Sequence, residues 1–123
     1  MIDKNILKNI TVLYAEDESV IQEGITETLN LFEINVICAK NGQEGLSIFN
    51  SLNKKIDLIL TDIKMPKLDG LGMIKKIREI DKEIPVIITT AHQETNFLMQ
   101  SIELDISAYV LKTIDIYKLI PYE

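Results

Sequence analysis

Five short apolar runs alternate with amphipathic segments along the chain, and this alternation constrains the fold more than any other feature. Each run has four to six residues, mostly β-branched or aliphatic. Runs of this kind are typical of strands that are covered on both faces of a parallel sheet. The predicted strands are Ile10–Ala15, Val36–Ala39, Leu58–Thr61, Val86–Thr90 and Ala108–Leu111.

The segments between the runs carry apolar residues at three- and four-residue spacing, which predicts helices with one buried stripe. These predicted helices are Glu18–Phe32, Gln43–Leu52, Leu71–Ile80, Glu94–Leu104 and a last segment from Ile114 onward. Alternating strands and helices favour right-handed crossovers. We therefore expect an α/β fold, a flavodoxin-like doubly wound five-stranded parallel sheet in the order 2-1-3-4-5, with helices on both faces.

Length and charge narrow the class of protein. The 123 residues fit a single domain, 1–123, and 13 Lys and Arg against 19 Asp and Glu leave a net charge of −6. This excess of acids argues against a nucleic-acid backbone as the partner. The N-terminus does not have the pattern of a signal peptide, and no apolar run is long enough to span a membrane. We therefore expect a cytoplasmic protein without membrane contact.

Cys38 is the single cysteine of the chain, so an internal disulfide framework and a Cys-rich metal site are excluded. Because it lies within an apolar run, we expect it to be buried as a small hydrophobic side chain.

Polar residues follow the predicted strands, where ligands bind in sheets of this type. Glu16 and Asp17 follow the first strand, Asp62 the third, Thr90 ends the fourth, and Lys112 follows the fifth. Carboxylates gathered at one edge would repel one another, and a hard divalent cation such as Mg²⁺ relieves that repulsion. A lysine and a hydroxyl nearby would suit a phosphoryl group. The pattern indicates transfer of a phosphoryl group to a carboxylate.

Four motifs, each at the end of a predicted strand, resemble those of the receiver domain of two-component response regulators (the CheY-like superfamily). The resemblance covers nearly the whole chain. The motifs are Leu13–Glu18, Asp62–Gly70, Pro85–Ala91 and Ala108–Lys112.

The resemblance implies a phosphoacceptor and a magnesium site. Asp62 matches the phosphoacceptor, and Asp17 matches the acid that contacts Mg²⁺ directly. Glu16 matches the neighbouring acid, which often acts through water, and the backbone carbonyl of Lys64 matches a third protein ligand.

The resemblance also implies a switch. Thr90 matches the hydroxyl residue that moves toward the phosphoryl group, Lys112 the essential lysine, and Tyr109 the aromatic residue that changes rotamer with it. Tyr109 can equally be read as an ordinary core aromatic. His92 lies near the expected pocket mouth, where it either tunes the lifetime of the phosphoryl group or is a simple loop residue.

The function implied is that of a phosphorylated switch rather than a turnover enzyme. A sensor histidine kinase or phosphotransfer protein would supply the phosphoryl group. The family's fourth helix, fifth strand and fifth helix would then change conformation and control an output domain or protein. A phosphorylation-dependent homodimer is one such output.

Three departures from the family pattern lie toward the C-terminus. Thr113 replaces the usual proline, and a cis Lys112–Thr113 bond would cost about 2.5–4 kcal/mol, so the sequence leaves cis and trans both open. Asp105 and Ile106 replace the usual glycine and alanine. The last helix is short and contains Pro121, so we expect a truncated helix and an output domain beyond it in a longer protein.

Other functions remain as alternatives. A receiver-like interaction module that takes no phosphate would share the fold. A phosphohydrolase with an aspartyl nucleophile would carry a second acid where Lys64 stands. A flavodoxin would bind a flavin phosphate after the first strand, where the acids of this chain would repel it. Asp69 and Gly70 are expected to form the turn that caps the third helix.

Overall fold

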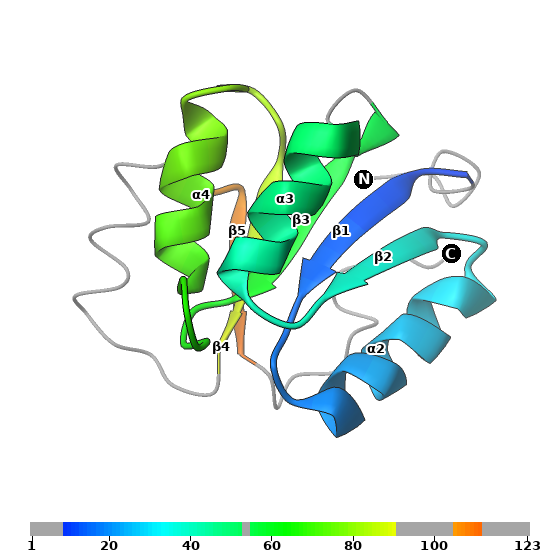
Figure 1. The fold of residues 1–123 in the computed structure, drawn as a ribbon. Helices are drawn as coiled ribbons and strands as arrows, with labels where there is room; N and C mark the ends of the chain where they lie inside the picture. The colour runs from blue at the N-terminus through cyan, green and yellow to red at the C-terminus, as the bar shows by residue number, and fades with distance from the viewer. Residues whose placement is uncertain (1–8, 53–54, 91–104, 112–123) are drawn as a thin grey trace.

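The computed structural model describes residues 9–52, 55–90 and 105–111 (Figure 1). Eight elements lie in these ranges. They are β1 (Thr11–Ala15), α2 (Ser19–Leu31), β2 (Asn35–Ala39), α3 (Gly42–Leu52), β3 (Leu58–Asp62), α4 (Gly70–Arg78), β4 (Val86–Thr90) and β5 (Ala108–Leu111). The first and last residues of each element lie within two residues of the ends of a predicted segment. The predicted helices Glu94–Leu104 and Ile114 onward fall outside the described residues.

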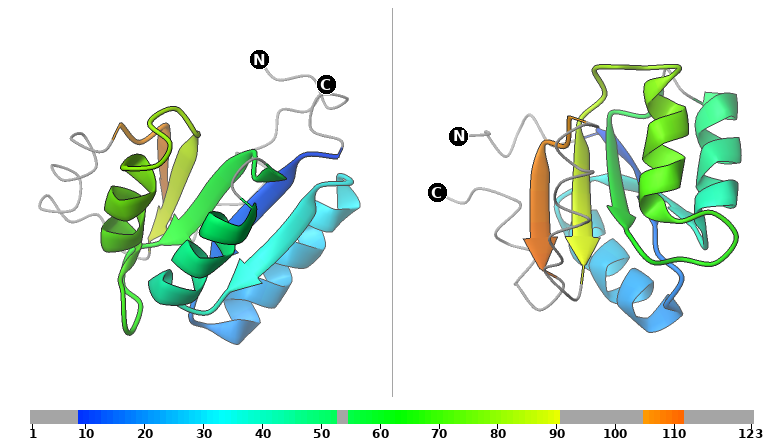
Figure 2. Two further views of the ribbon diagram at one scale, coloured as in Figure 1. Left: turned by 45° about the horizontal axis from the view of Figure 1, so that its top comes forward. Right: turned by 90° about the vertical axis from the view of Figure 1, so that its left-hand side faces the viewer.

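The five strands form one parallel sheet in the order β2-β1-β3-β4-β5, which confirms the predicted topology. The central strand β1 pairs with β2 on one side and with β3 on the other. All four pairings are parallel, so the carboxyl ends of all five strands lie along one edge of the sheet (Figure 2). That edge is where the sequence places its polar residues.

Helices cover both faces of the sheet, as predicted. Alternate residues of a strand point to opposite faces. On β1, Leu13 and Ala15 belong to a core cluster with residues of α3 and α4, whereas Val12 and Tyr14 belong to a second cluster with Leu29 of α2. Figure 2 shows α2 across the sheet from α3 and α4. Burial on both faces explains why the central strands read as continuous apolar runs.

The edge strand β2 does not follow this rule, and the prediction that Cys38 is buried is wrong. Cys38 is exposed, and its Sγ lies 3.4 Å from the hydroxyl of Thr26 on α2. An edge strand has a neighbour on one side only, so helices that cover the centre of the sheet leave part of β2 open to solvent. Of its five residues only Ala39 is buried.

A backbone cap ends α2 and turns the chain into β2. Glu33 adopts φ 61, the left-handed conformation that glycine usually takes after a helix. The N–H of Glu33 donates to Asn30 (3.0 Å), and the N–H of Ile34 donates to Leu29 (3.3 Å). Ile34 and Leu29 are also buried in the same cluster, so the cap and the core support each other.

The turn before β5 keeps the geometry of a glycine although it contains Asp105. Asp105 adopts φ 56, in the left-handed region. Arg78, at the end of α4, donates from its guanidinium to the carbonyl oxygens of Asp105 (3.0 Å) and Ile84 (2.7 Å). Arg78 therefore fastens the turn before β5 to the turn before β4.

Candidate functional site

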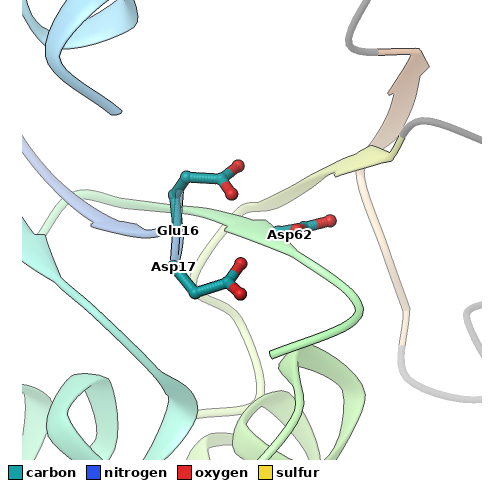
Figure 3. Close-up of side chains that lie close together, drawn as sticks. All are labelled: Glu16, Asp17 and Asp62. Carbon is teal, nitrogen blue, oxygen red and sulfur yellow. The ribbon is translucent and has the colours of Figure 1, made fainter. Parts of the chain in front are cut away.

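Three acidic side chains meet where β1 and β3 end. Ala15 pairs with Thr61 in the parallel ladder, so Glu16, which follows β1, comes beside Asp62 at the end of β3. Glu16, Asp17 and Asp62 each present a carboxylate oxygen, and these three atoms lie within 4.8 Å of one another. Figure 3 shows the three side chains gathered at this edge. The structure thus brings together the three acids that the sequence predicts.

The three acids differ in burial. Glu16 is 1% exposed and Asp62 is 6% exposed, whereas Asp17 is exposed to solvent. Carboxylates that lie this close in a partly buried place repel one another unless a cation or a proton compensates the charge. An all-oxygen set with one open side is the kind of site that suits Mg²⁺, which keeps several of its waters. The residues present therefore fit a magnesium ion.

Hydrogen bonds hold Glu16 at the start of the turn into α2. Its backbone N–H donates to Ala39 (3.0 Å), and its Oε2 accepts from the N–H of Glu18 (3.2 Å). The side-chain amide of Gln22 on α2 donates to the carbonyl oxygens of Glu16 (3.2 Å) and Ala39 (2.9 Å). This network ties the ends of β1 and β2 to the first turn of α2, so the position of Glu16 follows from the backbone around it.

Asp62 is held by the backbone that follows it. Its Oδ1 accepts from the N–H of Ile63 (2.8 Å), and its carbonyl oxygen accepts from the hydroxyl of Thr61 (2.8 Å). The N–H of Gly70 donates to Ile63 (2.7 Å), and a Cβ at Gly70 would collide with the carbonyl oxygen of Asp62. Glycine is therefore needed at this position.

The end of the loop between β3 and α4 is held by hydrogen bonds from two helices. Asp69 caps α4, since its Oδ1 accepts from the N–H of Gly72 (2.7 Å), which confirms the predicted cap. At the start of α3 the N–H of Gly42 donates to Leu68 (2.8 Å). Lys64 lies in this loop with an exposed side chain, and its carbonyl oxygen stays a predicted metal ligand.

The remaining predicted site residues lie at the ends of β4 and β5. The ladder pairs Asp62 with Thr89, and Thr90 with Leu111, the residue before Lys112. The backbones of the strands that lead to Thr90 and Lys112 thus reach the same edge as the acids. The side chains of Thr90 and Tyr109, and all of His92, Lys112 and Thr113, lie outside what the structure describes.

The structure adds one residue that the sequence analysis missed. Tyr14 lies in β1 with an exposed fraction of 0%, two residues before Glu16, on the sheet face that packs against Leu29 of α2. Burial raises the pKa of its phenol far above the usual range, and the charges of Glu16, Asp62 and Cys38 raise it further. The available signal was a tyrosine among the apolar residues at the end of the predicted strand, two residues before Glu16 and so on the same face as Glu16.

Comparison with known proteins agrees with this arrangement. The model of the response regulator receiver domain family matches residues 12–122. Sporulation initiation phosphotransferase F of Bacillus subtilis is 32% identical over 110 residues, which are 89% of this chain and 87% of that protein. The structure of the response regulator protein TrrA from Thermotoga maritima, in complex with Mg²⁺-BeF, has a TM-score of 0.80 and 31% identity over 89% of this chain and 92% of that one.

Some relatives are much longer than this chain. A probable transcriptional regulator of Cyanidium caldarium is 38% identical over 101 residues, which are 82% of this chain but 39% of that protein. The chain therefore spans about two fifths of the length of such regulators. Within the part of the chain that the structure describes, no helix is long and apolar enough to cross a membrane.

Proposed function

Because the chain belongs to the family of response regulator receiver domains, we propose that it accepts a phosphoryl group on Asp62 from a phosphohistidine of a sensor histidine kinase or phosphotransfer protein. The observation that carries this proposal is the cluster of Glu16, Asp17 and Asp62, whose carboxylate oxygens lie within 4.8 Å of one another where β1 and β3 end. Asp62 is the carboxylate at the end of β3, and the N–H of Ile63 donates to its Oδ1.

The proposed reaction moves one phosphoryl group between two side chains. An oxygen of the Asp62 carboxylate attacks phosphorus, a new O–P bond forms, and the N–P bond of the phosphohistidine breaks. The imidazole leaves with the electron pair of that bond and takes up a proton. The product is an acyl phosphate, which water later hydrolyses to phosphate and the free carboxylate.

The acids beside Asp62 would hold the metal. Asp17 is the proposed direct ligand together with Asp62 and the carbonyl of Lys64, and Glu16 is proposed to act through water. When bound, Mg²⁺ would offset the negative charge that develops on the transferring phosphoryl oxygens. The complex of TrrA with Mg²⁺-BeF supports this proposal, since that protein shares the fold and 31% of the sequence.

The proposed switch depends on residues whose side chains the structure does not describe. Thr90 and Lys112 are proposed to contact the phosphoryl oxygens, and Tyr109 to follow the movement of Thr90. Phosphorylation would bias a pre-existing equilibrium of the surface formed by Glu94–Leu104, β5 and the segment from Ile114 onward. We propose that this surface controls an output domain or protein in the cytoplasm, that homodimerisation is one route, and that the domain is not a turnover enzyme.

Two variants test the proposed phosphoacceptor. Asp62→Asn keeps the shape of the side chain but removes the nucleophile, so labelling by acetyl phosphate or by a phosphorylated kinase is expected to fall to background. The matched control is Asp57→Asn, near the opposite end of β3, where the carboxylate accepts from the N–H of Thr11 (2.8 Å). This control should be labelled like the wild-type chain.

The outcome separates the two main functions. Labelling of Asp62→Asn at the wild-type rate would contradict the proposed phosphoacceptor. If the wild-type chain is neither labelled nor able to bind beryllofluoride with Mg²⁺, the alternative function holds, an interaction module that is not phosphorylated.

A further inference from the structure

The hydroxyl of Tyr14 is buried without a hydrogen-bond partner among the described residues. A hydroxyl that is removed from water and left unpaired destabilises the fold, so buried hydroxyls nearly always have a partner. The neighbours of Tyr14 on β1 are Val12, Leu13 and Ala15, all of them apolar and buried. A phenylalanine would satisfy the same packing, so packing does not explain the hydroxyl.

The position of Tyr14 relates it to the acidic cluster. It lies two residues before Glu16 on the same face of β1, and it pairs with Leu60, two residues before Asp62 on β3. Leu29 of α2 belongs to the same buried cluster and helps to separate this face from solvent. Burial raises the pKa of the phenol, and the charges of Glu16 and Asp62 raise it further.

Each oxygen of the Glu16 carboxylate can accept more than one hydrogen bond. The N–H of Glu18 donates to its Oε2 (3.2 Å), and its Oε1 is buried as well. A carboxylate that binds a metal ion or its waters is commonly oriented by further hydrogen bonds from neighbouring groups. The phenol of Tyr14 is a buried donor on a residue two positions before Glu16, and so on the same face of the chain.

We propose that Tyr14 is a positioning residue of the carboxylate site, and that its hydroxyl orients Glu16 for Mg²⁺ by donating a hydrogen bond, directly or through one water molecule. This inference rests on the proposed function, because it assigns Tyr14 a role in the same magnesium site. Tyr14 touches neither the phosphoryl group nor the reacting oxygen of Asp62 in this proposal. Its effect is on metal affinity.

The test compares the wild-type chain with Tyr14→Phe. Magnesium affinity is measured by titration calorimetry, and thermal unfolding is followed in the absence of metal. Loss of one hydrogen bond is expected to weaken Mg²⁺ binding by about 2- to 10-fold. The metal-free variant should unfold at a temperature no lower than that of the wild type, because in the metal-free structure the hydroxyl has no hydrogen-bond partner among the described residues. Labelling by acetyl phosphate should slow at low Mg²⁺ and recover at saturating Mg²⁺.

Two further variants show whether the effect passes through Glu16. In a Glu16→Gln background, Tyr14→Phe should weaken Mg²⁺ binding no further. The matched control is Thr89→Val, which removes another buried hydroxyl, one that already lies 3.5 Å from the carbonyl oxygen of Thr61. This control should lower the unfolding temperature and leave Mg²⁺ affinity unchanged.

The results separate this inference from the proposed function. If Tyr14→Phe binds Mg²⁺ as tightly as the wild type, the inference is wrong while the function stands. If the wild-type chain neither binds Mg²⁺ nor is labelled, both fail. A measurement on the wild type guards against a variant that does not fold: the ring-carbon resonances of Tyr14 should shift on Mg²⁺ titration, and their constancy would overturn the inference.

Discussion

At the residue scale, the site depends on an absent side chain as much as on the acids. Gly70 begins α4 directly against the carbonyl oxygen of Asp62, and its N–H donates to Ile63. No described glycine has a positive φ, so the requirement here is for space rather than for backbone freedom. Asp69 therefore caps the helix, and Gly70 lets the start of that helix lie against Asp62.

Gly70→Ala is accordingly expected to destabilise the fold by about 1–3 kcal/mol, because the added methyl group forces the backbone at Asp62 to move. The measurement is the free energy of unfolding in urea. The matched control is Gly24→Ala in α2, where an added Cβ meets nothing within 4 Å. This control should stabilise the fold by about 0.5–1 kcal/mol, because alanine favours a helix interior. Equal effects of the two substitutions would contradict this account.

At the element scale, the end of α2 shows how the chain achieves a standard turn with a non-standard residue. The backbone hydrogen bonds of Glu33 and Ile34 are those of a cap that usually contains glycine. Glu33 carries a side chain into a conformation that disfavours one. The buried contact between Ile34 and Leu29 compensates for this strain.

Glu33→Gly should therefore be more stable than Glu33→Ala by about 1 kcal/mol. Both variants lose the glutamate side chain and its contacts, so their difference isolates the effect of a Cβ at φ 61. Thermal or urea unfolding measures it. A Glu33→Ala variant that is as stable as Glu33→Gly would show that the left-handed conformation carries no strain here.

The elements also show where prediction from sequence succeeds and where it stops. The runs that became β1 and β3 were recognisable because residues on both of their faces are buried. The strand order was predicted as that of the flavodoxin-like doubly wound fold, and the sheet has this order. Cys38 was placed wrongly because an apolar run does not reveal that its strand lies at the edge of the sheet. Edge position is a property of the whole topology and not of the segment.

At the scale of the whole molecule, the candidate site is a consequence of parallel pairing. Asp62 lies more than forty residues after Glu16 and Asp17 in the sequence, and the pairing of β1 with β3 brings the three carboxylate groups together, with oxygens within 4.8 Å of one another. Their chemistry was readable from the strand ends. The role of Tyr14 could not be predicted from the sequence, because it depends on the burial of the hydroxyl and on the charges around it.

The most direct test of the central claim is to locate the phosphoryl group in the wild-type chain. The chain is incubated with acetyl phosphate with and without Mg²⁺, reduced with borohydride, which converts an aspartyl phosphate to homoserine, and mapped by mass spectrometry. We predict homoserine at position 62 in the sample with Mg²⁺ and unchanged aspartate in the sample without it. Modification at another acid, or none at all with Mg²⁺ present, would contradict the assignment of Asp62 as the phosphoacceptor.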